Sequence, residues 1–290
     1  MYRVITIDKR GAHKSLPNFF RFIKNLKKNN YDIVYSPHRS LRSGIIALSM
    51  SLTESFSFEN SALKFAFRNV VKYDYSAHEV RRNLEFIGSD YPGNTWRIIP
   101  EIVIPEESIN KVKKILNENN INKFIAVAPG SVWETKRYPV DYYKQIVKFF
   151  SDSNFQIVLI GGTSDKTLCD EIKKDFNTNV TTVAGKLSFI DSIQLLKHSL
   201  LLICNDSAPT HLCVCANIPV LTIYCSTVPY FGFYPYNSKS DFISYDKLNC
   251  KPCGIHGHSS CPIDTFECAW LLTPDKIISK ARKLLSDANI

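Results

Sequence analysis

The second half of the chain alternates short apolar runs with segments of helical periodicity. Continuous apolar runs are typical of strands buried on both faces of a parallel sheet, and apolar residues three and four positions apart predict the helices between them. The pattern predicts strands over 124–128, 155–160, 180–183, 200–204 and 218–224, and helices over 140–150, 166–176, 189–198, 208–216 and 273–285. We therefore expect a doubly wound α/β domain.

The first part of the chain shows the same alternation with weaker signals. Strands are predicted over 3–7, 31–35, 54–58 and 69–72, and helices over 16–26, 39–51, 76–87 and 105–120. We divide the chain into an α/β domain over residues 1–120, whose last helix serves as the linker, a second α/β domain over 121–272 and a C-terminal helix over 273–290.

Composition and charge narrow the class of protein. A chain of 290 residues with 44% hydrophobic and 22% charged residues suits a globular protein, and no apolar run reaches the length of a membrane span. The N-terminus begins as a short strand rather than a signal peptide, so we expect a cytoplasmic protein. Residues 1–100 hold 16 Lys and Arg against 8 Asp and Glu. This basic part could face an anionic substrate, a membrane surface or nucleic acid, or carry solvated lysines.

A turn at residues 205–207 joins a buried strand to a helix. Such a turn aims free backbone N–H groups at the carboxyl end of the sheet, where a phosphate or diphosphate can bind. Asp206 and His211 flank this turn. The alternative is an ordinary N-capped helix, with Asp206 at the surface and His211 in the packing.

Two further loops follow strands of the second domain. In the first, Ser131 lets the backbone approach a phosphate and Lys136 can supply a positive charge. In the second, Gly162 precedes Asp165, whose carboxylate could hold a pair of ribose hydroxyls. Because the carboxyl ends of parallel strands meet at one edge of the sheet, the three loops together predict a nucleotide diphosphate site.

The first domain places basic side chains at two helix starts. Arg39 and Arg42 follow a predicted strand, and His78 and Arg82 lie near the start of a later helix. Both positions suit contact with an anionic ligand. The alternatives are ordinary helix-start chemistry at Arg39 and Arg42, and a solvated basic helix face, which is the more common case, at His78 and Arg82.

Four of the nine cysteines cluster near the C-terminus. Cys250, Cys253, Cys261 and Cys268 have a spacing that suits structural zinc, with two histidines between them. A cytoplasmic location argues against disulfides. Free thiols are the alternative, and the interpretation stays open between the two.

Several motifs resemble one known family. The stretches Ala128-Pro-Gly-Ser131, Lys136-Arg-Tyr-Pro139 and Asn205-Asp-Ser-Ala-Pro-Thr-His-Leu212 are similar to the nucleotide-sugar domain of glycosyltransferase family 9, the lipopolysaccharide heptosyltransferases. Leu41-Arg-Ser43 and Tyr31-Asp-Ile-Val34 extend the resemblance into the first half. The resemblance implies a GT-B-like fold, in which two Rossmann-like doubly wound domains face a cleft.

The resemblance also implies an activity. It implies transfer of a heptose or similar sugar from an ADP-sugar, typically ADP-heptose, to a lipopolysaccharide core acceptor, with inversion at the anomeric carbon and without a metal. The C-terminal domain would bind the nucleotide-sugar donor, and the basic N-terminal domain the anionic glycolipid acceptor. We expect no cofactor, peripheral contact with the cytoplasmic face of the inner membrane, and no nucleic-acid partner, since nucleic-acid-binding motifs are absent.

Individual residues receive roles from the resemblance. Lys136 matches the lysine at the diphosphate, and Asp165 lies where the family more often has a glutamate on the ribose. Further matches lie at the diphosphate and sugar, namely Asp206, Ser207, Ala208 and His211. Three basic residues match family positions that are expected to face acceptor phosphates, namely Arg39, Arg42 and Arg82.

One departure from the family concerns catalysis. The family opens with a strand and a Gly-Asp loop whose aspartate is the presumed general base, and this chain begins at what resembles the following strand. Asp8 ends that strand and matches the base poorly. The catalytic base is therefore unassigned. Either the N-terminal domain is incomplete, another carboxylate serves, or the protein is an inactive homologue that binds nucleotide-sugar or glycan without transfer.

Overall fold

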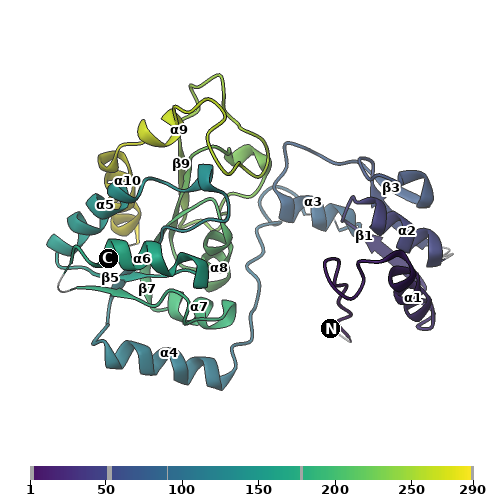
Figure 1. Ribbon diagram of the computed structural model, residues 1–290, viewed down its shortest axis with the longest axis horizontal. Helices are drawn as coiled ribbons and strands as arrows, with labels where there is room; N and C mark the ends of the chain where they lie inside the picture. The colour runs from purple at the N-terminus through teal and green to yellow at the C-terminus, as the bar shows by residue number, and fades with distance from the viewer. Residues whose placement is uncertain (1–2, 51–53, 90, 177–178, 289–290) are drawn as a thin grey trace. The chain divides into compact units, whose positions relative to one another are not determined.

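The computed structural model describes residues 3–50, 54–89, 91–176 and 179–288. The chain forms two compact units, Met1–Trp96 and Arg97–Ile290, and each contains a parallel sheet (Figure 1). The division at residue 96 differs from the one predicted at residue 120. Helix α4 (Glu106–Glu118) buries Val112 and Leu116 in the core of the second unit, so it is part of that unit rather than a linker.

The second unit is built on a six-stranded parallel sheet. Its strand order is β6-β5-β4-β7-β8-β9, the Rossmann order. The strands are parallel, and the order in which the chain visits them reverses between β4 and β7, which is the switch point of the sheet. The doubly wound fold predicted from the sequence is confirmed. The strands are β4 (Phe124–Ala128), β5 (Gln156–Leu159), β6 (Val180–Thr182), β7 (Ser199–Asn205), β8 (Val220–Tyr224) and β9 (Asp241–Ser244).

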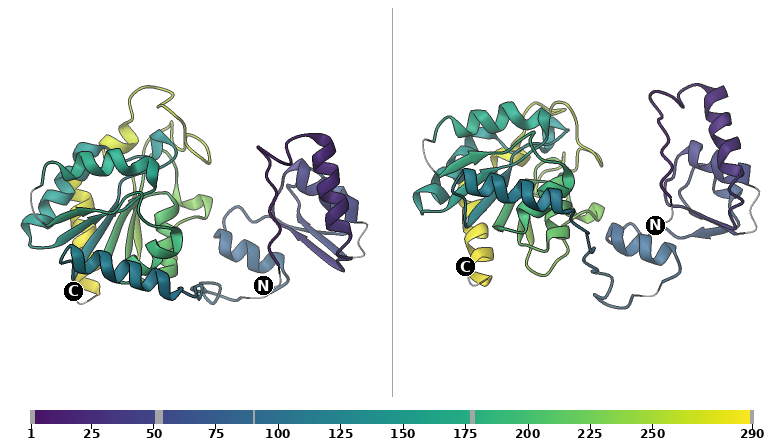
Figure 2. Two further views of the ribbon diagram at one scale, coloured as in Figure 1. Left: turned by 60° about the horizontal axis from the view of Figure 1, so that its bottom comes forward. Right: turned by 90° about the horizontal axis from the view of Figure 1, so that it is seen from below.

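Helices cover both faces of this sheet (Figure 2). Ile125 and Val127 of β4 point to one face, whereas Phe124 and Ala126 point to the other, as the two-residue period of a strand requires. The first face packs against α5 (Val140–Asp152), α6 (Lys166–Lys173) and α10 (Pro274–Asp287), and the second against α4, α7 (Phe189–Leu196) and α8 (Ala208–Ala216). The C-terminal helix is therefore part of the second unit's core.

The first unit has a smaller sheet with the order β1-β2-β3, and all of its strands are parallel. Its buried cluster is aromatic and consists of Phe58, Tyr73 and Phe86. Its elements are α1 (Leu16–Lys27), β1 (Ile33–Ser36), α2 (Leu41–Met50), β2 (Glu54–Phe58), β3 (Asn69–Val71) and α3 (Glu79–Phe86).

The strand predicted over residues 3–7 is wrong. Val4 and Ile5 are exposed, and within the described residues this segment pairs with no strand. Alternating apolar residues form a strand only where a neighbouring strand accepts their backbone hydrogen bonds. Among the helices that the structure describes, none is both long and apolar enough to span a bilayer.

Candidate functional site

A cavity of about 220 Å³ lies at the switch point of the second unit, where the loops after β4, β5 and β7 meet. A larger hollow of about 740 Å³ between α5 and α10 receives none of these loops, so we assign the site to the cavity at the switch point. Five predicted site residues line that cavity, namely Ser131, Gly162, Asp165, Ser207 and Ala208. The structure thus brings the three loops together.

Asp165 lies across the backbone of two of these loops. Its Oδ2 accepts a hydrogen bond from the N–H of Gly162 at 2.8 Å. A Cβ on Gly130 would lie 2.2 Å from Asp165 Oδ1, and one on Gly161 would lie 2.7 Å from Asp165 Cβ. Both positions therefore need glycine because the aspartate occupies the space of a side chain. The ribose contact predicted for Asp165 stays a prediction.

The end of β7 is fixed by Asn205, a buried residue that the sequence analysis treated only as part of a turn. Its Nδ2 donates to the carbonyl of Pro129 at 2.7 Å, and its Oδ1 accepts from the Tyr138 N–H and the Tyr143 hydroxyl, both at 3.0 Å. An uncharged side chain with donors and acceptors can join two loops in a dry core. Asn205 thus sets the distance between the β4 loop and the start of α8.

Lys136 and Asp206 form a largely buried ion pair beside the cavity. Lys136 Nζ lies 2.6 Å from Asp206 Oδ2, and the side chains are 14% and 12% exposed. The Thr227 hydroxyl donates to the same carboxylate oxygen at 2.7 Å. Asp206 is therefore not the surface residue of an ordinary N-capped helix. Thr227 lies in a stretch, Ser226-Thr227, that resembles the family, but the sequence analysis assigned it no role, and only the fold brings its hydroxyl to Asp206.

The loop that carries the clustered cysteines holds Lys136 in place. The N–H of Thr135 donates to the carbonyl of His258 at 3.1 Å, and the N–H of His258 donates to Thr135 Oγ1 at 2.8 Å. The Ser226 hydroxyl also donates to Thr135 Oγ1, at 3.0 Å. Gly257, at φ +83°, lies so close that a Cβ there would be 3.2 Å from Lys136 Cγ. This loop therefore positions the ammonium group of Lys136.

His211 lies one turn into α8, with its side chain partly open to solvent. Desolvation by the surrounding protein lowers the pKa of His211 below its ordinary value; Asp206 opposes this effect and Lys136 adds to it. This lowering of the pKa favours the neutral imidazole. A neutral imidazole can donate one hydrogen bond to an anionic ligand.

Residues 19–261 match the family model of glycosyltransferase family 9 (heptosyltransferase). The chain belongs to glycosyltransferase family 9. The resemblance drawn from its motifs is thereby confirmed.

Curated relatives of this family 9 chain are heptosyltransferases. The chain is 25% identical over 288 residues to lipooligosaccharide heptosyltransferase 2 of Campylobacter jejuni. The alignment covers 96% of this chain and 86% of the relative. It is 23% identical over 230 residues to lipopolysaccharide heptosyltransferase 3 of Escherichia coli, over 75% of this chain and 65% of the relative.

Solved structures share the fold. The glycosyltransferase family 9 protein of Veillonella parvula superposes with a TM-score of 0.83 at 18% identity, over 98% of this chain and 82% of that chain. The ADP-heptose heptosyltransferase II of E. coli superposes with a TM-score of 0.74 at 18% identity, over 95% and 82% of the two chains. The α/β architecture with parallel sheets is thus that of GT-B-like heptosyltransferases.

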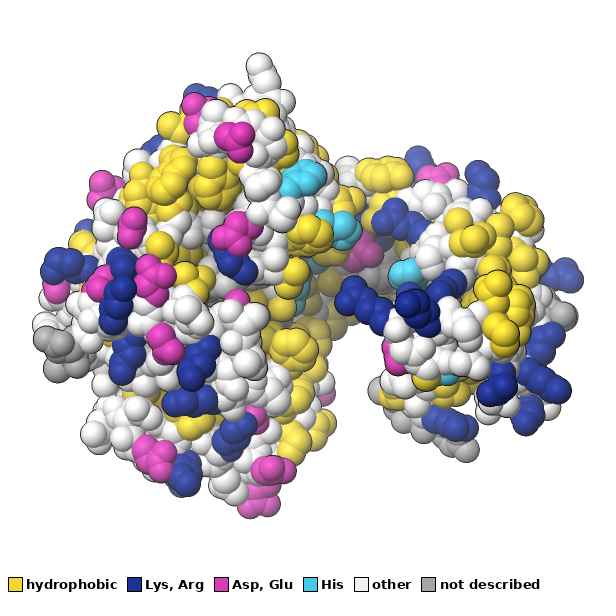
Figure 3. Space-filling view, in the orientation of Figure 1, with side chains coloured by type: hydrophobic (Ala, Val, Ile, Leu, Met, Phe, Trp, Pro, Cys, Tyr) yellow, Lys and Arg dark blue, Asp and Glu magenta, His cyan; other side chains and the backbone are white. Residues whose placement is uncertain are grey.

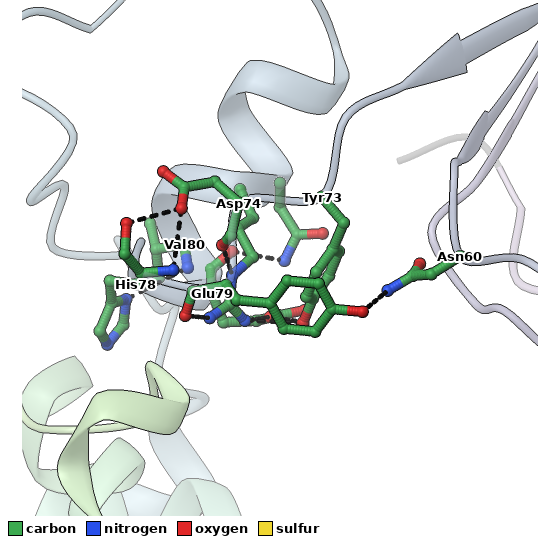
Figure 4. Close-up of polar contacts among 10 residues, drawn as sticks. Asn60, Tyr73, Asp74, His78, Glu79 and Val80 are labelled. Carbon is green, nitrogen blue, oxygen red and sulfur yellow. Dashed lines mark hydrogen bonds and ion pairs between the residues drawn. The ribbon is translucent and has the colours of Figure 1, made fainter.

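In the N-terminal unit of this family 9 chain, Arg82 is buried and donates hydrogen bonds to neighbouring residues. Its Nε donates to the carbonyl of Asp74 at 2.7 Å, and its Nη1 donates to the Tyr73 hydroxyl at 2.7 Å and to Glu79 Oε2 at 2.5 Å. Figure 4 shows Tyr73, Asp74 and Glu79 gathered at the start of α3. Arg82 therefore fixes this segment, and the acceptor contact predicted for it stays a prediction.

The other predicted acceptor residues have different surroundings. His78 caps α3 by accepting from the N–H of Val80 at 3.2 Å, and its ring stacks on Trp96. Arg42 lies over the ring of Phe19, with 5.5 Å to the centroid. Arg39 is exposed after β1, with its guanidinium 4.8 Å from the Tyr73 ring centroid. Arg39 thus combines exposure with a place at the carboxyl end of the first sheet.

Asp8 is a weak base in this structure. Its carboxylate accepts hydrogen bonds from the N–H groups of Arg10, Gly11 and Ala12, at 3.1, 2.8 and 2.9 Å. These bonds stabilise the ionised form and lower the pKa of Asp8. The poor match of Asp8 to the family's catalytic aspartate agrees with this environment.

The clustered cysteines form no disulfide among the residues that the structure describes. Cys250, Cys253 and Cys261 are half-buried and Cys268 is buried. Within the part of the chain that the structure describes, no three His, Cys, Asp or Glu side chains are arranged to hold a metal ion. The residues as placed do not fit a metal, and structural zinc stays a prediction without geometric support.

Proposed function

We propose that this family 9 chain transfers a heptose from ADP-heptose to a lipopolysaccharide core acceptor. The observation that carries the proposal is the cavity at the switch point, bordered by a buried Lys136–Asp206 pair. Solved relatives with the same fold include E. coli WaaC with ADP and with ADP-2-deoxy-2-fluoro heptose. A nucleoside diphosphate suits such a cavity, because Rossmann folds bind nucleotides at this edge of the sheet.

The cavity suits the adenosine part of the donor. Ile160, Leu187, Phe189 and Leu212 supply apolar surface for a base. Asp165 lies beside them with a carboxylate that can accept from ribose hydroxyls. We therefore orient the base toward these apolar residues, and the diphosphate toward the start of α8.

The diphosphate and sugar would lie near Lys136 and His211. The Lys136 ammonium has three donors, so it can keep its bond to Asp206 and still donate to a phosphate oxygen. The neutral form of His211, which its surroundings favour, can donate from its ring. Backbone N–H groups at Ser207 and Ala208 add positive potential at the helix start.

The proposed reaction is a displacement at the anomeric carbon. The acceptor hydroxyl oxygen forms a bond to C1 of the heptose while the bond from C1 to the diphosphate oxygen breaks, with inversion. The hydroxyl proton passes to a general base, which is unassigned among the residues of this chain, and ADP leaves with the bonding electrons. Lys136 and His211 stabilise the charge that develops on the diphosphate, which makes this route independent of a metal.

The acceptor would meet the N-terminal unit. Residues 1–100 carry twice as many basic as acidic side chains, and Arg39 is exposed at the carboxyl end of that unit's sheet. Guanidinium groups bind phosphates in two-pronged geometry. The proposed acceptor is therefore an anionic, phosphate-bearing glycolipid.

Radiolabelled sugar transfer from ADP-heptose to heptose-deficient lipopolysaccharide tests the proposal. Calorimetry with ADP is run on the same protein, on Asp206→Ala and on the matched control Asp152→Ala, which removes an exposed carboxylate of α5. We expect transfer by the parent and the control, and none by Asp206→Ala. A chain that binds ADP without transferring sugar would be the non-catalytic homologue, and a chain that binds no purine nucleotide diphosphate would overturn the proposal.

A further inference from the structure

The proposed transfer needs a general base, and the carboxylates of the loops after β4, β5 and β7 are already engaged. Asp206 is bound by an ammonium and a hydroxyl group, and Asp165 accepts a hydrogen bond from a backbone N–H. Glu134, on the loop after β4, forms an ion pair with Arg137 at 2.7 Å. Such bonds stabilise the ionised carboxylate and make it a weaker base. These three carboxylates are therefore poorly suited to take the acceptor's proton.

The loop over residues 253–258 is fixed where the β4 loop meets the end of β8. The N–H of Cys253 donates to the carbonyl of Ser226, which follows β8, at 3.0 Å. The N–H of His258 donates to Thr135 Oγ1 at 2.8 Å, and the Ser226 hydroxyl donates to the same oxygen at 3.0 Å. Both ends of the loop are thus held at one place, one residue from the lysine of the buried ion pair.

The cavity and the ion pair give the proposed donor a direction. The cavity is lined by the loops after β4, β5 and β7, whereas Thr227, which binds Asp206, follows β8. In the strand order β5-β4-β7-β8, the ion pair of Lys136 and Asp206 therefore lies between the cavity and the end of β8. A donor with its base in the cavity and its diphosphate at Lys136 would extend its sugar toward the 253–258 loop.

His258 of this loop combines a fixed backbone with a free side chain. Its N–H and its carbonyl both bond to Thr135, at 2.8 and 3.1 Å. Its imidazole is exposed, and among the described residues it has no hydrogen-bond or ion-pair partner. Figure 3 shows histidine side chains (cyan) at the surface of the C-terminal unit. Near neutral pH, imidazole is the side chain that most often takes up a proton in catalysis, through the lone pair of one ring nitrogen.

We propose that His258 is the general base of the transfer. The inference rests on the proposed function and names the group that receives the proton. As the acceptor hydroxyl oxygen bonds to C1 of the heptose, its proton passes to a ring nitrogen of His258. The bond from C1 to the diphosphate oxygen breaks, and ADP leaves with the bonding electrons. The imidazolium then releases its proton to water, which the exposure of the side chain allows.

Single-turnover sugar transfer by the full chain, together with calorimetry of ADP and ADP-heptose, tests this role. His258→Ala should slow transfer about 10²–10⁴-fold, the usual loss for a missing general base, and leave both affinities unchanged. Added imidazole should restore part of the transfer rate of His258→Ala and none to the parent, because a small base can take the proton at the vacated position. A residue that only supports the loop would not respond to imidazole.

His256→Ala is the matched control. It removes a second exposed imidazole from the same loop, two residues away from His258. This variant should transfer sugar like the parent and should not respond to imidazole. ADP binding by both variants reports that the C-terminal unit is intact.

Three results would overturn the assignment of His258. The first is transfer by His258→Ala at the parent rate, and the second is an equal loss in His256→Ala. The third is a loss in His258→Ala that imidazole does not restore, which would make His258 a support of the loop or a contact of the sugar. A parent that transfers no sugar would overturn the proposed function and this assignment together, whereas each of the three results in a parent that transfers sugar overturns the assignment alone.

Discussion

In the C-terminal unit, a hydrophobic core lies on each face of the sheet whose edge carries the site. Among the described residues of the N-terminal unit, the corresponding core is one small aromatic cluster. Every residue of β4 is buried, and Lys136 and Asp206 lie largely out of water beside it. In the N-terminal unit, Arg39 lies exposed over the ring of Tyr73. In the proposed function, the C-terminal unit would hold a small donor with its buried backbone and ion pair, and the N-terminal unit would present exposed charge to a large anionic acceptor.

Because of this difference, we expect variants in the two units to affect stability and ligand binding in different ways. In the C-terminal unit, a change at the site disturbs groups that cannot reach water, so stability and donor binding should fall together. In the N-terminal unit, exposed Arg39 should contribute to acceptor binding and little to folding, whereas buried Arg82 should contribute to folding and little to binding.

Asp206→Ala should give the largest loss. It leaves the Lys136 ammonium and the Thr227 hydroxyl without their acceptor, at a cost of about 3–5 kcal/mol in the free energy of unfolding. Urea unfolding and ADP calorimetry measure both effects. The double variant Lys136→Met/Asp206→Ala should recover stability but not ADP binding, because it removes the unpaired buried charge. Equal stability of Asp206→Ala and the control Asp152→Ala would contradict the buried pair.

Gly130→Ala should come next. The new methyl group would overlap the Asp165 carboxylate, and overpacking of this kind costs about 1–3 kcal/mol. Adding Asp165→Ala should restore stability, which a double-mutant cycle measures. Gly162→Ala is the control, since a Cβ there meets its nearest atom at 3.7 Å and φ is −74°. If the two glycine variants were equally stable, Asp165 would not be placed as described.

The two arginines at Tyr73 should behave in opposite ways. Arg82→Ala leaves buried acceptors unpaired and should destabilise the N-terminal unit by about 1–3 kcal/mol, with ADP affinity unchanged. Arg39→Ala should leave stability within about 0.5 kcal/mol while raising the KM for the glycolipid acceptor. Hydrogen exchange of α3 and acceptor titrations measure these effects. A KM change in Arg82→Lys without any change in exchange would show that Arg82 contacts the acceptor directly.

The smallest effect concerns the ion pair that ties α4 to α7. Burial would raise the pKa of Asp191, but hydrogen bonds from Lys111 and Ser188 lower it well below its usual range. A lowered carboxyl pKa adds stability above its unfolded value of about 3.9, and this stability is lost as the pH falls through the folded pKa. Lys111→Ala should therefore cost up to about 1 kcal/mol at pH 7 and less below about pH 4.

Urea unfolding of the C-terminal unit at a series of pH values measures this dependence. Lys114→Ala, which removes an exposed lysine of the same helix, is the control. A stability difference between Lys111→Ala and the control that grows as the pH falls would contradict a lowered pKa of Asp191.

The sequence alone predicted most helices and strands of the C-terminal unit and the three loops at its switch point. Apolar runs and helical spacing are local signals, and parallel strands separated by helices leave few arrangements for a sheet. The same reasoning missed the edge strand β9, whose residues are only half-buried, and wrongly predicted a strand over residues 3–7. Edges are poorly predicted because their pairing depends on neighbours rather than on local pattern.

Tertiary structure alone decided what the charged residues do. The sequence left Asp206 open between a surface helix cap and a ligand, and only folding places it against Lys136 and Thr227. The sequence grouped Arg39 with Arg82, and only folding exposes one and buries the other. A charge is recognisable in a sequence, but its partners come from distant segments, and burial sets how strongly the partners bind one another.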